Sequence, residues 1–446
     1  MALTPTSSTS IAAGAMPKVA HGDGIHVTDV SGKRYIDGSG GPAVFCLGHA
    51  NAEVNEAVAR QMDRIAHGYR YTFTSDPLEE LTAIVAEECG HGLSRMVFVT
   101  GGSEAVESAM KIALQYHAAR GEMSRRRFIA RERSWHGNTL GALSLSGFRE
   151  RRAPYEGALL DVSRLSAVNA YRPPDGVSAA DVAAHCAAEL EAEILAVGPD
   201  KVAAFVFEPV VGAAGGVVPA PGDYAARVRA ICDRYGVLLI ADEVMCGAGR
   251  CGTWRALAHD GVVPDIMTVA KGLAGGYLPL GATVFRGDIG DALDRAHGGP
   301  LTGHTFTGHT ACCAAGVAVQ KIVRRERLIE HVHLMGPKLQ AMLARATEGI
   351  EAVGDIRGRG FFVGVELVAN RATKAPFPAS DQLYLRIRQE TFARGLICYP
   401  SGGNVDGVNG DTVILSPPYI ATESQLQETA DIFAAGLKAA LAQIGR

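Results

Sequence analysis

The sequence contains no CxxC pair, and its nine cysteines are scattered along 446 residues. The one adjacent pair, Cys312–Cys313, does not have the spacing of metal ligands. An odd number of scattered cysteines in a long chain is typical of free thiols in a reducing compartment. The pattern therefore argues against a disulfide framework, and no metal site is predicted.

The sequence also lacks any run of about 18 apolar residues, so no segment is expected to span a membrane. Its first 18 residues, MALTPTSSTSIAAGAMPK, have neither the charged start nor the compact apolar run of a signal peptide, and we expect a partly disordered leader. The formal net charge is −4, and the basic residues are scattered apart from Arg125–Arg127. These features give no case for binding to nucleic acid or an anionic membrane and favour a cytoplasmic protein.

Apolar residues, in contrast, are plentiful: they make up 47% of the chain and can fill a large core. Between residues 51 and 312, apolar runs alternate with helical patterns. The predicted strands are 96–100, 203–210, 237–244 and 265–270, and the predicted helices are 51–66, 103–121 and 223–236. Near-continuous apolar strands alternating with helices indicate a large α/β domain, with a mostly parallel sheet flanked by helices.

The pattern changes at about residue 311. Long helices are predicted over 311–326 and 328–346, strand material over 354–368, and a last helix over 423–445. This mixture predicts a smaller α+β domain over residues 313–446. The N-terminal segment, residues 1–50, contains two short predicted strands between Gly24 and Gly38 and is expected to join that small domain.

Three chemically active groups follow three of the predicted strands. Gly102 and Ser103 come after MVFVT and open a helix, where free N–H groups favour an anion. Asp242 follows VLLIA, and Lys271 follows DIMTVA. Each residue alone has an ordinary explanation as an N-cap, a solvated aspartate or a strand-end lysine, but open parallel sheets bind ligands at this edge. An anion site, a carboxylate and an amine together suit the phosphate, the ring nitrogen and the aldehyde of pyridoxal phosphate.

A flat cofactor ring also needs surfaces on both faces. Trp135, followed by His136 and Gly137, could stack on one face, although a core tryptophan is equally common. Val244, two residues beyond Asp242, could cover the other face.

The chain resembles the class III aminotransferases, the omega-aminotransferase group of fold type I pyridoxal-phosphate enzymes. The resemblance extends from GIHVTDVSGKRYIDG to SPPYIATESQLQE. It is most specific in LLIADEVMCGAGRCGTW followed by PDIMTVAKGLAGGYLPLGA, where the spacing between Asp242 and Lys271 matches the family pattern. The resemblance implies the fold type I architecture, with residues 51–312 as the domain that binds pyridoxal 5′-phosphate.

The resemblance also implies roles for individual residues. Lys271 would bind the aldehyde of the cofactor and move protons, and Asp242 would pair with the ring nitrogen. The other implied cofactor contacts are Gly102 and Ser103 at the phosphate, Trp135 and Val244 on the ring faces, His136 and Glu208 near the cofactor, and Thr305 at the phosphate of a neighbouring subunit. A homodimer or larger assembly with shared active sites follows, in which a small amine donor and a keto acid exchange an amino group.

Substrate recognition departs from the ornithine-type enzymes, which carry an arginine before the Pro-Pro pair and a glutamate beyond the EP motif. Ile414 and Ala213 stand at those places. Tyr399 takes the place of the mobile arginine of amine:pyruvate enzymes. The residues predicted to line the resulting less polar pocket are Phe45, Tyr69, Trp135 and Tyr399, with Arg70 as the nearest cation for a carboxylate. We expect a primary amine or an omega-amino acid as donor and pyruvate as acceptor.

Three other interpretations remain open. Aminomutases, epimerases and decarboxylases of the same family use the same lysine and aspartate. A nicotinamide-dependent enzyme would need GxGxxG after the first strand, and GGSEAVES does not have this pattern. The same segment also lacks the GK[ST] ending of a phosphate-binding P-loop. A non-catalytic protein on this fold would be expected to have lost Lys271 or Asp242, and both are present.

Overall fold

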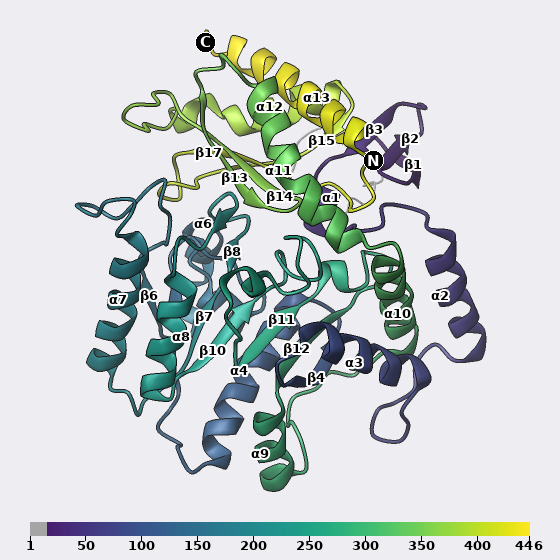
Figure 1. Cartoon of the computed structure of the whole chain (residues 1–446), viewed down its shortest axis with the longest axis vertical. Coiled ribbons are helices and arrows are strands. Elements are labelled where there is room, and N and C mark those ends of the chain that lie inside the picture. Colours follow the sequence, from purple (N-terminus) through teal and green to yellow (C-terminus); the bar gives the residue numbers. More distant parts are fainter. Residues whose placement is uncertain (1–15) are drawn as a thin grey trace, which may run out of the picture.

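The computed structural model of the chain describes residues 16–446. A large α/β body lies below a smaller body that contains both the N-terminal strands and the C-terminal helices (Figure 1). Most of the leader expected over residues 1–18 lies outside the described residues. Directly after it, Val19–Asp23 forms strand β1, which the sequence did not predict.

The large body is built on a seven-stranded sheet with the order β4-β12-β11-β10-β7-β5-β6. Its strands are β4 (Leu93–Val99), β12 (Gly281–Arg286), β11 (Ile266–Val269), β10 (Leu238–Asp242), β7 (Val202–Phe207), β5 (Arg127–Arg131) and β6 (Val162–Leu165). β12 is antiparallel to both of its neighbours, and the other strand pairs are parallel. A mostly parallel sheet was predicted; the reversed strand β12 was not.

Helices cover both faces of this sheet, as strand β7 illustrates. Ala204 and Val206 pack on one side with residues of α4 (Gly102–Ala119). Phe205 and Phe207 point to the other side and pack with α7 (Val182–Val197) and α8 (Tyr224–Tyr235). Because successive strand side chains alternate between faces, burial on both sides requires the continuous apolar run seen in the sequence.

The predicted helices of the large body are present, with ends shifted by up to a few residues. Besides α4, α7 and α8, the large body contains α2 (Ala52–Arg64), α3 (Asp76–Cys89), α5 (Leu140–Leu145), α6 (Arg149–Arg152), α9 (Gly287–His297) and α10 (Thr310–Arg325). It also contains 3-10 turns at Ala153–Ala158, Ala256–Asp260 and Lys271–Leu273. α10, which begins near the boundary expected between the two domains, packs against α2 and α3.

The smaller body combines segments from both ends of the chain. One sheet, in the order β13-β14-β17-β16, is antiparallel throughout, and a second, β1-β2-β3-β15, joins the N-terminal strands to a late strand. Their remaining strands are β2 (His26–Asp29), β3 (Arg34–Asp37), β13 (Val353–Arg359), β14 (Phe362–Leu367), β15 (Leu396–Ile397), β16 (Tyr399–Gly402) and β17 (Asp411–Leu415). The helices are α11 (Leu328–Ala346), α12 (Leu383–Ala393) and α13 (Glu423–Ala442), with a 3-10 turn at Ala379–Asp381. A short turn, α1 (Gly40–Ala43), and a two-stranded ribbon, β8 (Val210–Val211) and β9 (Val218–Pro219), complete the elements.

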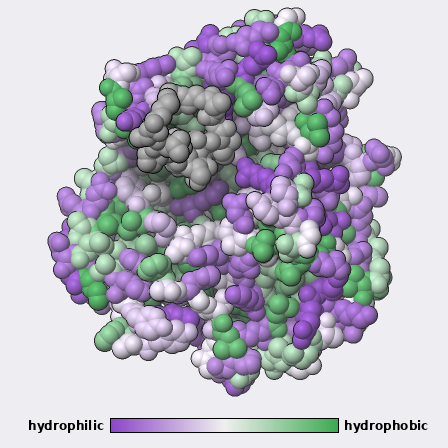
Figure 2. All heavy atoms as spheres, turned by 180° about the vertical axis from the view of Figure 1, so that it is seen from behind, coloured by the Kyte–Doolittle hydropathy of each residue, from purple (hydrophilic) through white to green (hydrophobic). Residues whose placement is uncertain are grey.

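The surface, the helices and the cysteines show whether this part of the chain has features of membrane-spanning, metal-binding or disulfide-containing proteins. On the face shown in Figure 2, hydrophilic residues predominate, with hydrophobic residues scattered among them. Within residues 16–446, no helix combines the length and the apolar character needed to cross a membrane. The same part of the chain has no group of three His, Cys, Asp or Glu residues placed to hold a metal ion. All nine cysteines are buried and free.

Candidate active site

Lys271 follows strand β11 and sits in an unusual backbone conformation. Its φ is +49°, in the left-handed region that non-glycine residues seldom adopt, and such strain often occurs at functional sites. Its ammonium group donates a hydrogen bond to the carbonyl oxygen of Pro42 at 3.3 Å. Exclusion of water lowers the pKa of Lys271 to about 8, although the carboxylates of Asp242 and Glu208 act in the opposite direction. The amine is therefore neutral, and nucleophilic, in about a tenth of molecules at pH 7, far more than for an ordinary lysine.

Asp242 ends strand β10, beside β11, and is 3% exposed. Its Oδ1 accepts hydrogen bonds from Thr268 Oγ1 at 3.0 Å and from the Val244 backbone N–H at 3.1 Å. Its Oδ2 lies 2.7 Å from Nδ1 of His136, whose ring is buried. A carboxylate accepts about four hydrogen bonds, so Asp242 is held rigidly yet keeps capacity for a further donor.

Glu208 positions the segment that carries Trp135 and His136. It is 3% exposed and lies just beyond β7. Its Oε1 accepts a hydrogen bond from the Trp135 backbone N–H, and its Oε2 accepts one from the Gly212 N–H, both at 2.9 Å. Burial raises the pKa of Glu208 to about 7; the charge of His136 opposes this shift and that of Asp242 reinforces it. The structure therefore places Glu208 as a support for the Trp135 backbone.

The turn that opens α4 is packed closely against two other parts of the site. A Cβ atom on Gly102 would lie 2.8 Å from a methyl carbon of Val244, so only glycine allows this approach. Gly137, with φ of +143°, lies against Ser103 in the same way. The Ser103 hydroxyl accepts a hydrogen bond from the Asn138 backbone N–H at 3.0 Å. The helix start, the strand end and the tryptophan segment thus meet at one place.

Trp135 forms one wall of an apolar region. Its ring meets that of Phe148 edge-to-face, with centroids 5.8 Å apart and an interplanar angle of 89°. Ala213 and Tyr399 pack in the same cluster. The guanidinium carbon of Arg151 lies 4.7 Å from the centroid of the Trp135 ring. The small body, through Tyr399 of β16, therefore packs against apolar side chains of the large body at this place.

Phe45 lies over the loop that follows Lys271. A Cβ atom on Gly276 would lie 2.6 Å from its ring, so the ring packs directly on the backbone of the GLAGG turn. Arg250, 1% exposed, donates hydrogen bonds to the carbonyl oxygens of Phe45, Phe361 and Pro417, and its charge also lowers the pKa of Lys271. The sequence analysis did not single out Arg250, although its place within GAGRCG is a weak signal.

Three residues that the sequence predicts for the site lie apart from Lys271 in this chain: Tyr69, Arg70 and Thr305. Arg70 places its guanidinium carbon 4.6 Å from the centroid of the Tyr71 ring, donates to the Tyr71 hydroxyl at 2.8 Å and lies against Gly303. Tyr69 is 51% exposed, and Thr305 is exposed on the loop before α10. The contacts among the described residues of this single chain do not bring these three side chains to Lys271.

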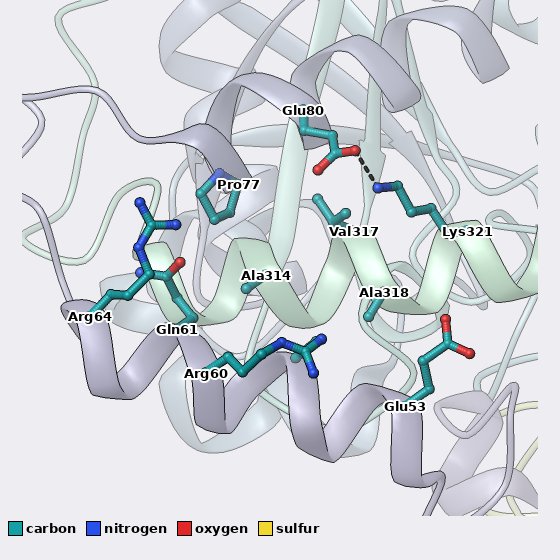
Figure 3. Close-up of a pocket in the computed structure, with 11 residues that line it drawn as sticks. Glu53, Arg60, Gln61, Arg64, Pro77, Glu80, Ala314, Val317, Ala318 and Lys321 are labelled. Atoms are coloured by element: carbon teal, nitrogen blue, oxygen red, sulfur yellow. Dashed lines mark ion pairs between the residues drawn. The ribbon is translucent and has the colours of Figure 1, made fainter.

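A separate groove lies between α2, α3 and α10, with a volume of about 380 Å³ (Figure 3). Ala57, Ala314 and Val317 contribute to its floor, and the ion pair between Glu80 and Lys321 lies at its rim. It shares no residue with the Lys271 site.

The donor set fits pyridoxal phosphate. Lys271 offers an amine of lowered pKa, and Asp242 offers a fixed carboxylate on the adjacent strand. The first turn of α4 offers free N–H groups in a cradle that a side chain on Gly102 would fill. His136 adds a buried ring whose Nε2 has no protein partner among the described residues.

Comparisons with known proteins show the family of this chain. The model of the class III aminotransferase family matches residues 11–437. An aminotransferase of Schizosaccharomyces pombe is 40% identical over 415 residues, which cover 92% of this chain and 90% of that protein.

Two solved structures are also similar to this chain. A transaminase from the marine bacterium Virgibacillus has a TM-score of 0.91 at 32% identity, covering 99% of this chain and 98% of its own. An (S)-enantioselective omega-transaminase from Thermomicrobium roseum has a TM-score of 0.88 at 34% identity, covering 96% and 93%. This chain therefore belongs to the class III aminotransferases, fold type I enzymes that use pyridoxal 5′-phosphate.

Proposed function

We propose that this enzyme transfers the amino group of a primary amine or an omega-amino acid to pyruvate. The donor loses its amino group and becomes a ketone or an aldehyde, while pyruvate gains it and becomes alanine. Bound pyridoxal phosphate supplies the aldehyde that carries the amino group between the two half-reactions and a ring that accepts electron density. The protein supplies the proton transfers and the orientation of the substrates.

Lys271 performs the proton transfer in this proposal. Its amine would hold the aldehyde of the cofactor in the resting enzyme and, when free, would remove the proton from the substrate carbon next to nitrogen. Asp242, held in position by its bonds to Thr268 and Val244, would keep a proton on the ring nitrogen. Gly102 and Ser103 would bind the phosphate, Trp135 and Val244 would cover the ring, and Glu208 and His136 would fix that arrangement.

The observation that carries the choice of substrates is the burial of Ile414. This side chain is 1% exposed and packs with Ala43, Met245 and Phe362, beside Tyr399. Ala213, 8% exposed, lies near Trp135. The two places where ornithine-type enzymes carry an arginine and a glutamate are thus filled by packed apolar side chains. A second carboxylate, such as that of 2-oxoglutarate, would be buried there without a partner at a cost of several kcal/mol.

A homodimer or larger assembly is part of the proposal, with Thr305 at the phosphate of the neighbouring subunit. The exposure of Thr305 in the single chain supports it. Tyr69, which is exposed, and Arg70, which is half-buried against Gly303, also remain candidates for the substrate site. The nine free cysteines favour a cytoplasmic location.

An absorbance titration of the holoenzyme tests the function. The yellow cofactor should lose its visible band on addition of aliphatic or aromatic primary amines, and pyruvate should restore the band at lower concentration than 2-oxoglutarate. Better recovery with 2-oxoglutarate would contradict the proposed pocket. Conversion of the amine without formation of a carbonyl product would favour the aminomutase, epimerase or decarboxylase alternatives.

A further inference from the structure

Pyruvate carries one carboxylate, and the apolar cluster around Trp135 and Tyr399 has no cation at the place of Ile414. This inference rests on the proposed function and concerns the group that binds this carboxylate. An unpaired carboxylate in a site closed to water is strongly disfavoured, so a productive complex requires a guanidinium or an ammonium group within hydrogen-bonding distance.

Arg151 is a guanidinium beside the apolar cluster of Trp135 and Phe148. It lies in α6, between the buried Phe148 and the first 3-10 turn. Its guanidinium carbon is 4.7 Å from the centroid of the Trp135 ring and 5.0 Å from that of Phe148. The side chain is exposed, and among residues 16–446 it has no carboxylate within ion-pair distance and no acceptor for its N–H groups.

The other arginines near the site are already engaged. Arg133 pairs with both oxygens of Glu150 at 3.2 Å and donates to the carbonyl oxygen of Gly403 at 2.7 Å. Arg250 is committed to three carbonyl oxygens. Arg70 lies apart from the site in this chain and donates to the Tyr71 hydroxyl. Arg151 is therefore the guanidinium beside Trp135 whose donors are all available.

Glu150, the residue before Arg151, holds the segment that carries Arg151 in place. The ion pair between Arg133 and Glu150 fixes the residue before Arg151, and the Arg133–Gly403 hydrogen bond connects the same point to the loop after β16. That loop connects β16 to β17. The anchoring reduces the conformational freedom that Arg151 would lose when it binds a ligand.

A guanidinium beside an aromatic ring is suited to this task. The ring attracts its positive charge, and its planar fork of N–H groups can bind a carboxylate through two parallel hydrogen bonds. We propose that Arg151 binds the carboxylate of pyruvate, and of donors that carry one, while the remaining atoms of the substrate lie against Trp135 and Tyr399. Substrates without a carboxylate use the same pocket and leave Arg151 in water.

The test compares acceptors with and without a carboxylate. KM is measured for pyruvate and for butanal with 1-phenylethylamine as donor, in the wild type and in Arg151→Gln. We expect the KM for pyruvate to rise roughly 10- to 100-fold, as for loss of a charged hydrogen-bond pair, and the KM for butanal to stay within about twofold. Arg151→Lys, which keeps the charge but not the fork, should recover part of the loss.

Arg149→Gln is the matched control. Arg149 lies on the same short helix and pairs with Glu132 at 3.1 Å, so its loss removes an equal charge from the same surface and should leave both KM values unchanged. An equal rise in both KM values for Arg151→Gln would show that Arg151 only supports the Trp135 ring. An unchanged KM for pyruvate, or a rise in Arg70→Gln instead, would also overturn the proposal.

Binding of 3-phenylpropionate separates this inference from the proposed function. This acid has a carboxylate but no carbonyl group to be aminated, and its Kd is measured from the absorbance change of the holoenzyme. A wild type that does not aminate pyruvate would contradict the proposed function. The Kd of the acid would still test Arg151, since it should weaken by the same factor in Arg151→Gln and not in Arg149→Gln.

Discussion

Nδ1 of His136 lies 2.7 Å from Oδ2 of Asp242, and both side chains are almost completely buried. The pair joins the segment after β5 to the end of β10. Because Trp135 precedes His136 and Glu208 holds the Trp135 N–H, the carboxylate and the tryptophan are positioned by one hydrogen-bonded unit. Substitutions of Glu208 or His136 should therefore alter the positions of both the Asp242 carboxylate and the Trp135 side chain.

Replacement of Asp242 by Asn should separate cofactor binding from turnover. The amide keeps the shape but removes the negative charge that holds a proton on the ring nitrogen. We expect the cofactor to stay bound while kcat falls by several orders of magnitude, on the order of 10³-fold or more. Thr268→Val, which removes one hydrogen bond to Oδ1 but keeps the charge, should cause a much smaller loss. Near-normal kcat in Asp242→Asn, measured on enzyme with its cofactor content confirmed, would contradict the assigned role.

The lowered pKa of Lys271 should govern how fast the apoenzyme takes up its cofactor. Only the neutral amine attacks an aldehyde, and with a pKa of about 8 its fraction rises roughly fivefold between pH 7 and 8 and levels off above pH 9. A lysine at its usual pKa of about 10.4 would instead show a tenfold rise per pH unit up to pH 9. Stopped-flow absorbance measures the rate, and borohydride reduction followed by peptide mapping should place the label on Lys271.

Glu208 should make the stability of the apoenzyme depend on pH. Its pKa is raised to about 7 in the fold from an ordinary value of 4.5, so the folded protein keeps a proton that the unfolded chain releases between these values. The free energy of unfolding therefore decreases as pH rises from 4.5 to 7 and then levels off. The decrease in Tm over this range should be smaller in Glu208→Gln. Buried Glu243, also with a pKa of about 7, should give a similar effect in Glu243→Gln; a wild type with constant Tm would contradict both.

Shared active sites can be tested by mixing two inactive variants. Lys271→Ala removes the amine, and Thr305→Asp places a negative charge where the phosphate of the neighbouring subunit is expected. If Thr305 acts across the interface, a mixed dimer contains one intact site, and refolding the two variants together should restore about a quarter of wild-type activity per subunit. No recovery, or an active monomer in sedimentation velocity, would show that each subunit uses its own Thr305 or none.

Much of the arrangement could be predicted because it depends on local patterns. Strand ends followed by Gly102, Asp242 and Lys271 are visible in the sequence, and a parallel sheet must place these ends at one edge. The direction of strand β12 could not be predicted, because it depends on how the chain returns to the sheet after Lys271. The stacking of Arg151 on Trp135 joins two segments with no shared periodicity, so no local signal reveals it.

The parallel pairing of β15 with β3 has a consequence for the synthesis of the protein. Beside this pair of strands, Lys33 donates a hydrogen bond at 2.8 Å to the carbonyl oxygen of Ala393, at the end of α12 and 360 positions later in the chain. At translation rates of about 5–20 residues per second, the N-terminal strands wait roughly 20 to 70 s for this partner. During that time β3 presents an unpaired edge, which is a site for association with other chains. Chaperones should therefore be needed first at strands β1–β3, well before the active site is complete.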